Sequence, residues 1–164
     1  MRDSAEFDAF YTSTGARILG QVYLMVGDRG RAEDAVAEAY ARAWQRWSTV
    51  SEHADPAAWV RTVAYRIAVS SWRRVLRRRA GDWARPVPAL GAGSAALLDA
   101  LRRLPATQRR AIVLHHLAGL TVAQIAAETA FSESAVRAHL TRGQAALADQ
   151  LDDRDDDKEN YRAR

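Results

Sequence analysis

Helical periodicity runs through nearly all of this chain of 164 residues. Apolar residues recur three and four positions apart, which places them on one face of an α-helix, and no segment shows the sustained alternation typical of a β-strand. The first apolar stripe begins at Phe7 and ends at Met25, and Gly27 then opens a GDRG turn. The pattern therefore predicts an all-α protein.

Two more helices are expected in the N-terminal half. The first spans residues 31–47 and carries Val36, Tyr40, Ala43 and Trp47 on one side. The second begins after Asp55, because Asp55 and Pro56 suit the N-cap and first helical positions, and it is expected to continue to about residue 79. Together with the first helix they predict a bundle of three to four helices.

The segment 80–93, AGDWARPVPALGAG, interrupts this periodicity with two prolines and three glycines. We therefore expect a domain at residues 1–79, a flexible linker at 80–93 and a second small helical domain at 94–151. Its first helices are expected at 95–104, with Leu97, Leu101 and Leu104 facing inward, and at 107–117. The charged tail 152–164 is expected to be disordered.

Residues 121–147 have the form of a helix-turn-helix. Thr121 and Gln124 form a capping-box pair, residues 129–131 break the first helix, and Ser132 can cap the second. In that second helix Val136, Leu140 and Leu147 face inward. The outward residues are short or basic and suit a DNA major groove: Arg137, Ala138, Thr141 and Arg142.

Six arginines and no acidic residue occupy residues 66–79. At about 100° per residue, Arg66, Ser70, Arg73 and Arg77 share a sector of roughly 60° beside the packing face of the third helix. Arginines beside Trp72 suit single-stranded DNA, since the guanidiniums follow phosphates and the ring stacks on a base. Taken alone, the arginines also fit a solvated helical face, and Trp59 is expected to be an ordinary core ring.

Composition argues against several other classes of function. The chain has no cysteine, which excludes disulfides and thiolate chemistry and fits a reducing cytoplasm. It has no signal peptide and no apolar run of about 18 residues, so we expect a cytoplasmic location and no membrane span. His115 and His116 are expected to point about 100° apart, and His139 to lie on the surface. No enzymatic activity, metal or cofactor is expected, because no catalytic or phosphate-binding motif is present.

Three segments in a fixed order carry a family resemblance. They are RAEDAVAEAYARAW at 31–44, DPAAWVRTVAYRIAVSSWRR at 55–74, and LRRLPATQRRAIVLHHLAGLTVAQIAAE at 101–128 followed by SESAVRAHLTRGQAAL. The chain resembles an extracytoplasmic-function (ECF) sigma factor of the sigma-70 family over residues 7–151. The resemblance implies sigma domains 2 and 4, core RNA polymerase and promoter DNA as partners, and promoter-specific initiation as the function. An anti-sigma factor is a further candidate partner.

The resemblance also implies where the polymerase binds. The helix at 31–47 matches the segment that contacts the clamp helices of the largest polymerase subunit, through Asp34, Glu38 and Arg42. Relatives usually carry glutamine at the position of Ala37, so one polar contact is expected to be missing. Without the resemblance, Asp34 and Glu38 would be interpreted as a solvated helix face.

The two DNA-reading surfaces follow in the same way. Arg66 and Ser70 stand where many relatives have asparagine or aspartate, which leaves the identity of the −10 base open. The −10 region set comprises Arg66, Ser70, Trp72, Arg73, Arg74, Arg77 and Arg78, the last four arginines holding phosphates. The −35 set comprises Gln124, Arg137, Ala138, Thr141 and Arg142.

Two other functions fit part of the pattern. A conventional helix-turn-helix regulator would use the N-terminal bundle to sense a ligand or to dimerise, and a helical adaptor would bind protein only. Neither function calls for an acidic second helix together with an arginine-aromatic third helix.

Overall fold

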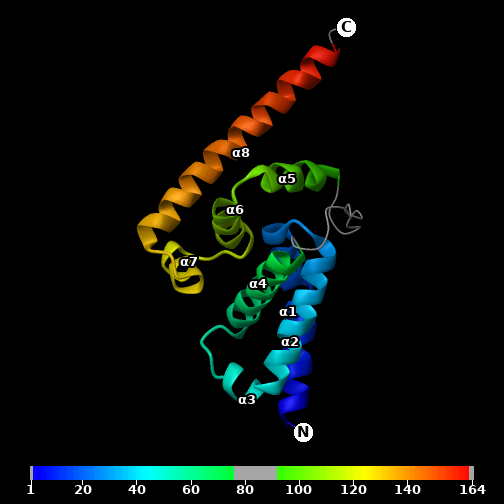
Figure 1. Cartoon of the computed structure of the whole chain (residues 1–164), viewed down its shortest axis with the longest axis vertical. Helices are drawn as coiled ribbons and strands as arrows, with labels where there is room; N and C mark the ends of the chain where they lie inside the picture. Colours follow the sequence, from blue (N-terminus) through cyan, green and yellow to red (C-terminus); the bar gives the residue numbers. More distant parts are fainter. Residues whose placement is uncertain (1, 76–91, 163–164) are drawn as a thin grey trace. The chain divides into compact units, whose positions relative to one another are not determined.

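The computed structural model describes residues 2–75 and 92–162, and every element within these ranges is helical. This confirms the all-α prediction (Figure 1). The chain divides into two compact units, an N-terminal unit, Met1–Val87, and a C-terminal unit, Pro88–Arg164.

The N-terminal unit is a bundle in which α2 packs against both α1 and α4 (Figure 1). Its helices are α1 (Arg2–Val26), α2 (Arg29–Gln45), α3 (Trp47–Val50) and α4 (Pro56–Val75). The core combines large side chains from α1 with alanines from α2 and α4, and small residues let helix axes approach closely. Among the fully buried residues are Ile18, Val22, Ala32, Ala39, Ala43, Val60, Ala64 and Ala68.

The helix starts in this unit follow local chemistry. Gly27 takes a positive φ of 79° in the turn after α1, where glycine carries no steric penalty. The Asp28 side chain then caps α2 by accepting a hydrogen bond from the backbone N–H of Arg31 at 2.9 Å. Asp55 accepts from the N–H of Ala58 at 3.0 Å, so the predicted cap of α4 is confirmed. Residues 76–79, the expected end of this helix, lie outside the described residues.

The predicted helix 31–47 is too long at its C-terminal end. The backbone breaks at Arg46 and Trp47 begins the separate short helix α3. There the Trp47 ring lies 5.1 Å from the ring of Phe7 and 5.0 Å from that of Phe10, and only 6% of Trp47 is exposed. Burial of this large ring against α1 offsets the cost of interrupting the helix at Arg46.

The described part of the C-terminal unit contains five consecutive helical segments. They are α5 (Ala92–Arg103), α6 (Ala106–Ile112), the π-helix η1 (Val113–Leu117), α7 (Val122–Thr129) and α8 (Glu133–Arg162). Its core includes Leu98, Leu101, Leu104, Val113, Leu114, Ile125, Val136 and Leu140. The prediction that Leu97 faces inward is wrong: Leu97 is exposed and the adjacent Leu98 is buried, whereas Leu101 and Leu104 are buried as predicted.

A close approach at Gly143 joins α8 to α6. A Cβ atom added at Gly143 would lie 2.9 Å from Cγ1 of Ile112, closer than packed carbon atoms approach one another. Helix α8 therefore lies directly against α6 because residue 143 has no side chain.

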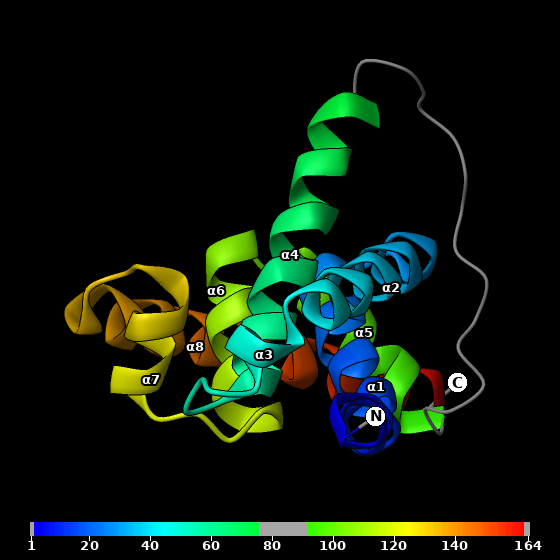
Figure 2. The same cartoon turned by 90° about the horizontal axis from the view of Figure 1, so that it is seen from below.

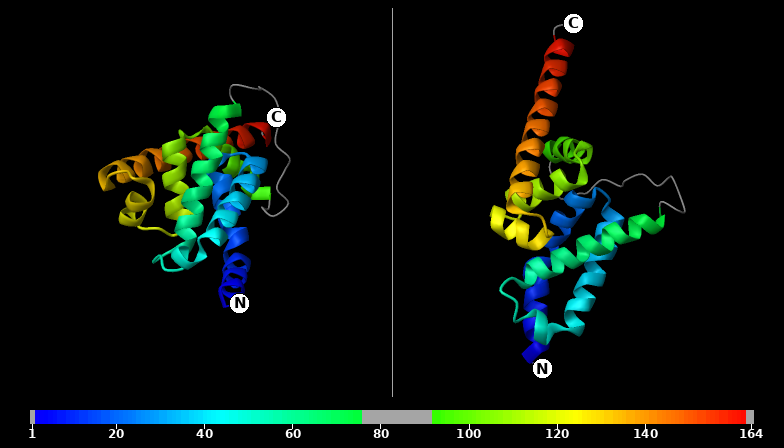
Figure 3. Two further views of the ribbon diagram at one scale, coloured as in Figure 1. Left: turned by 60° about the horizontal axis from the view of Figure 1, so that its bottom comes forward. Right: turned by 60° about the vertical axis from the view of Figure 1, so that its left-hand side comes forward.

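The tail differs from the sequence prediction. Helix α8 continues as backbone helix through residues 152–162, where disorder was expected, and extends past the other helices of its unit (Figure 3). Extension of an already anchored helix adds one hydrogen bond per residue without a new nucleation step, which the charge of the tail does not prevent. No helix in the described ranges is long and apolar enough to cross a bilayer.

Candidate functional site

The first candidate surface is the solvent side of α4, whose C-terminal half extends past α1 and α2 (Figure 2). Arg66 and Ser70 are exposed one turn apart, while Ala64 and Ala68 on the opposite side are buried. Tyr65 is half-buried at the border. The structure thus places the first two residues of the −10 region set together on one open helical face.

The rest of that set is only partly described. Trp72, Arg73 and Arg74 belong to helix α4, but their side chains are not among those that the structure describes. Arg77 and Arg78 lie outside the described residues altogether.

One residue of this face was not singled out from the sequence. Val69 is 36% exposed and lies about 60° around the helix from Arg66, on the side away from Ser70. An exposed apolar side chain beside an arginine is suited to contact an unstacked base. The one indication of this role in the sequence is that Val69 falls outside the side of α4 that carries the buried residues.

The second candidate surface is the helix-turn-helix formed by α7 and α8. Thr121 and Gln124 make the predicted capping box: the N–H of Gln124 donates to Thr121 Oγ1 at 3.2 Å and the N–H of Thr121 donates to Gln124 Oε1 at 2.9 Å. Ala130 takes the left-handed conformation that ends α7, with φ of 61°. Ser132 accepts from the N–H of Ala135 at 3.1 Å and caps α8, so both predicted caps are confirmed.

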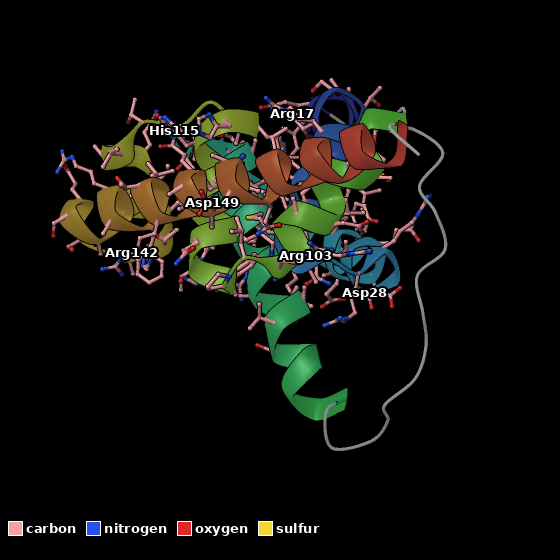
Figure 4. All side chains as sticks on the ribbon, turned by 90° about the horizontal axis from the view of Figure 1, so that it is seen from above. Arg17, Asp28, Arg103, His115, Arg142 and Asp149 are labelled. Carbon is pink, nitrogen blue, oxygen red and sulfur yellow. The ribbon has the colours of Figure 1, made fainter. Side chains whose placement is uncertain are left out.

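The caps orient the first half of α8, which is the predicted recognition helix. Arg137, Thr141 and Arg142 are exposed, and Figure 4 labels Arg142 on this part of α8. Arg137 pairs with Glu133 at 2.9 Å, an exposed pair that adds little stability and leaves the guanidinium accessible to a stronger anion. Ala138 was expected to point outward and is half-buried instead.

Gln124 has a divided role. Its Oε1 accepts the capping hydrogen bond from Thr121, and its exposed amide nitrogen keeps two donor hydrogens. The capping contact therefore fixes the side chain while leaving donors for a phosphate or a base acceptor.

One prediction about the histidines is wrong. His139 is half-buried, because its ring packs 5.2 Å from the ring of Phe131 at the turn of the motif. The rings of His115 and His116 lie 4.8 Å apart, and they contact different partners: Nδ1 of His115 lies 2.8 Å from the Leu120 carbonyl oxygen, and Nε2 of His116 lies 3.0 Å from Nε2 of Gln144. Within the described ranges no three histidine or acidic side chains cluster as a metal site would require.

The third candidate surface is the solvent face of α2. Asp34, Glu38 and Arg42 are all exposed there, and Ala37 is exposed beside them. Glu38 pairs with Arg42 at 2.8 Å, whereas Asp34 makes no ion pair within the described part of the chain. This face also exposes Trp44, which was not predicted from the sequence as a site residue.

Comparison with known proteins assigns these two units. Residues 10–80 match the family model for sigma-70 region 2, and residues 94–147 match the model for sigma-70 region 4. The two models occur in the order expected of one sigma factor and fall on separate compact units.

Characterised relatives agree with this assignment. The chain is 27% identical to the ECF RNA polymerase sigma factor SigK of Mycobacterium tuberculosis (strain ATCC 25618 / H37Rv), over 92% of this chain and 88% of the relative. It is 29% identical to SigK of Mycolicibacterium vanbaalenii, over 89% and 82%.

Solved structures support the fold. The sigma factor RpoE of Bartonella quintana, crystallised with the anti-sigma factor NepR, superposes with a TM-score of 0.78 at 19% identity over 90% of this chain and 97% of that chain. CnrH, solved with the cytosolic domain of CnrY, gives 0.63 at 23% identity over 91% and 89%. Sigma factors regulate transcription and are not enzymes. The chain belongs to the sigma-70 family as an ECF sigma factor, an RNA polymerase subunit that binds core polymerase and promoter DNA to direct transcription initiation.

Proposed function

We propose that three separate helical faces divide the work of initiation: α2 binds core polymerase, α4 reads and holds the opened −10 strand, and the first half of α8 reads the −35 element. The observation that carries this assignment is that each face is open to solvent while its opposite side forms the core of its own unit. Each face can therefore meet a partner without unfolding.

For the −35 element, Arg137, Thr141 and Arg142 enter the major groove. An arginine that donates both hydrogen bonds to guanine contributes about 1–3 kcal/mol of discrimination. Gln124, at the start of α7, contacts the phosphate backbone of the DNA through its free amide hydrogens. Half-buried Ala138 keeps the helix close to the groove, because a larger side chain would hold it away.

For the −10 region, Arg66 and Ser70 contact the melted strand and the arginines that follow hold upstream phosphates. Trp72 stacks on an exposed base. Unstacking a base costs a few kcal/mol, and capture on the protein offsets that cost.

For core polymerase, Asp34, Glu38 and Arg42 present charge from one face of α2 to the clamp helices of the largest subunit. This role requires no bond-making chemistry of the chain itself, and it places the protein where polymerase works, in the cytoplasm. The structure of RpoE solved with the anti-sigma factor NepR also supports an anti-sigma partner for this chain.

Replacement of both Arg137 and Arg142 by alanine tests the assignment. Run-off transcription from the cognate promoter should fall while binding to core polymerase survives, and Arg29→Ala, which removes one arginine outside the two proposed DNA-reading faces, serves as a control. Loss of polymerase binding together with transcription would count against the division of labour. Regulators without polymerase binding and protein-only adaptors are disfavoured, because neither accounts for matches to both sigma regions in order.

A further inference from the structure

His139 is a polar side chain in the first half of α8 to which the proposed function gives no role. Its ring is half-buried, and the Nδ1 atom is enclosed by protein without a hydrogen-bond partner in the described part of the chain. Leaving a buried nitrogen without a partner costs free energy, and such atoms are rare in folded proteins. The position of this nitrogen therefore needs a physical explanation.

The turn of the helix-turn-helix holds the His139 ring in place. The ring centroid lies 5.2 Å from that of Phe131, with the two ring planes at 53°. Phe131 is fixed in turn, because its backbone N–H donates to Thr129 Oγ1 at 3.4 Å. A ring held between the turn and α8 loses little conformational entropy when its free edge meets a partner.

Burial of one nitrogen selects the tautomer of the His139 ring. A neutral imidazole carries its proton on either Nδ1 or Nε2. A proton on Nδ1 would bury an N–H donor without an acceptor, and orphaned buried N–H groups are rarer than orphaned acceptors. The proton therefore belongs on Nε2, which makes no hydrogen bond within the described ranges and is not enclosed by them. His139 thus offers one N–H donor to the solvent.

The donor stands at the border of the exposed side of α8. At about 100° per residue, His139 lies about 60° around the helix from Arg142 and about 40° from Gly143. Arg142 is exposed, whereas Gly143 packs against α6. A helix in the major groove turns the middle of its exposed side to the bases and its borders to the sugar-phosphate walls. The Nε2–H group is therefore placed for a phosphate and not for a base edge.

We infer that His139 donates a hydrogen bond from Nε2 to a phosphate oxygen beside the −35 element and so positions α8 in the groove. Contact with Phe131 fixes the direction of the donor, and burial of Nδ1 fixes its tautomer. The contact needs no positive charge, in contrast to those of Arg137 and Arg142. The inference rests on the proposed role of α8 and adds to it a positioning residue of a different chemical kind.

Two substitutions in the full chain separate the donor from the ring. His139→Phe keeps a ring against Phe131 and removes both nitrogens, whereas His139→Gln keeps an N–H donor near the place of Nε2 and removes the ring. Binding is measured by fluorescence anisotropy at about pH 8, above the usual range of histidine ionisation. The probe is a short duplex with the −35 element of a promoter that the wild-type holoenzyme transcribes.

His139→Phe should bind this duplex about threefold to tenfold more weakly than the wild type, as expected for one lost hydrogen bond. His139→Gln should bind within about twofold of the wild type, because the donor is kept. The salt dependence of His139→Phe should equal that of the wild type, since a neutral donor releases no counterion. Its unfolding temperature should not fall, because carbon replaces the buried nitrogen that lacks a partner.

The matched control is His53→Phe, which makes the same replacement at an exposed position of the N-terminal unit and should leave duplex affinity unchanged. If His139→Phe binds as the wild type does while His139→Gln binds weakly, the ring matters only for packing and the inference is wrong. A smaller salt dependence of His139→Phe would also overturn it, because that result requires a cationic contact.

If both variants bind weakly, the tautomer of the wild type decides between donor and packing. Long-range proton–nitrogen NMR spectra should show a protonated Nε2 and an unprotonated Nδ1, and the reverse assignment would refute the inference. The proposed function is tested separately by the variant that carries both Arg137→Ala and Arg142→Ala. If that variant loses affinity and His139→Phe does not, only the role of His139 fails. If the double variant binds the duplex as the wild type does, the proposed −35 role of α8 itself fails.

Discussion

Gly143 shows how a single residue sets the distance between two helices. A glycine inside a helix costs about 1 kcal/mol relative to alanine, so propensity alone favours replacing it. The Cβ of Gly143→Ala, however, would meet Cγ1 of Ile112 at 2.9 Å and Cδ1 at 3.3 Å. Overpacking a tight core costs about 1–3 kcal/mol, so the replacement should destabilise the C-terminal unit.

Hydrogen exchange of the α6 and α8 amides should therefore be faster in Gly143→Ala than in the wild type. Gly20→Ala is the control, because Gly20 lies inside α1 and an added Cβ would have no neighbour within 4 Å. That variant should be up to about 1 kcal/mol more stable than the wild type. Unchanged protection of α6 and α8 would show that Ile112 can move aside.

Tyr40 couples the stability of the N-terminal unit to pH. Burial raises the pKa of Tyr40 above its usual value of 10.0, although its hydrogen bond with Thr14 Oγ1 at 2.7 Å opposes this. The folded state then holds the phenol proton more tightly than the unfolded state does. This contribution is fully present below about pH 10 and is lost as the pH rises through the folded pKa.

Urea unfolding followed by tryptophan fluorescence should show a steeper loss of stability from about pH 9 to about pH 11 for the wild type than for Tyr40→Phe. The tryptophans Trp44, Trp47 and Trp59 all report on this unit. Equal slopes for the two proteins would mean that Tyr40 ionises as freely when folded as when unfolded.

Substitutions at Arg66 distinguish phosphate binding from base recognition in the −10 region. Lysine keeps the charge of arginine but lacks its planar fork of donors. If Arg66 reads a base, Arg66→Lys and Arg66→Ala should both reduce open-complex formation about tenfold or more, measured by permanganate reactivity of the melted thymines. If lysine restores wild-type opening, Arg66 contacts only a phosphate.

At the scale of the element, the capping box governs the entry to the helix-turn-helix. At the start of α7 the side chains of Thr121 and Gln124 each accept a hydrogen bond from the backbone N–H of the other residue. Loss of an N-cap side chain costs about 1 kcal/mol, so Thr121→Ala should loosen α7 and weaken binding to a −35 duplex severalfold. Thr107→Ala is the control, because Thr107 is exposed in α6, whose start has no side-chain cap. Equal affinity of the two variants for the duplex would contradict a structural role for the cap.

Element boundaries that depend on near neighbours were predictable. Asp55, Thr121 and Ser132 cap their helices as expected, because each capping bond spans only three residues. The break at Arg46 and the π-turn at Val113–Leu117 were not predicted. Both arise where burial of side chains in the core outweighs regular backbone geometry, and residues distant in sequence decide that balance.

At the scale of the whole molecule, promoter spacing tests the use of both units. Two DNA-binding units on one chain gain affinity only when both can engage at once. Changing the distance between the −35 and −10 elements by about 5 bp, half a turn of B-DNA, places one element on the opposite side of the duplex. Run-off transcription should fall to the level of a promoter whose −35 element is scrambled, and full activity at the altered spacing would show that one unit acts alone.

The sequence by itself determined the helical class, the caps, the order of the two sigma regions and the residue types offered to DNA and polymerase. These features depend on periodicity and on chemistry within a few residues. The tertiary structure decided which side chains are free: it half-buries Ala138 and His139, exposes Leu97 and Val69, and presents Tyr11 and Trp44 on the surface. Exposure depends on which helices cover a position, and a one-residue rotation of a helix moves a side chain by about 100°, from core to solvent.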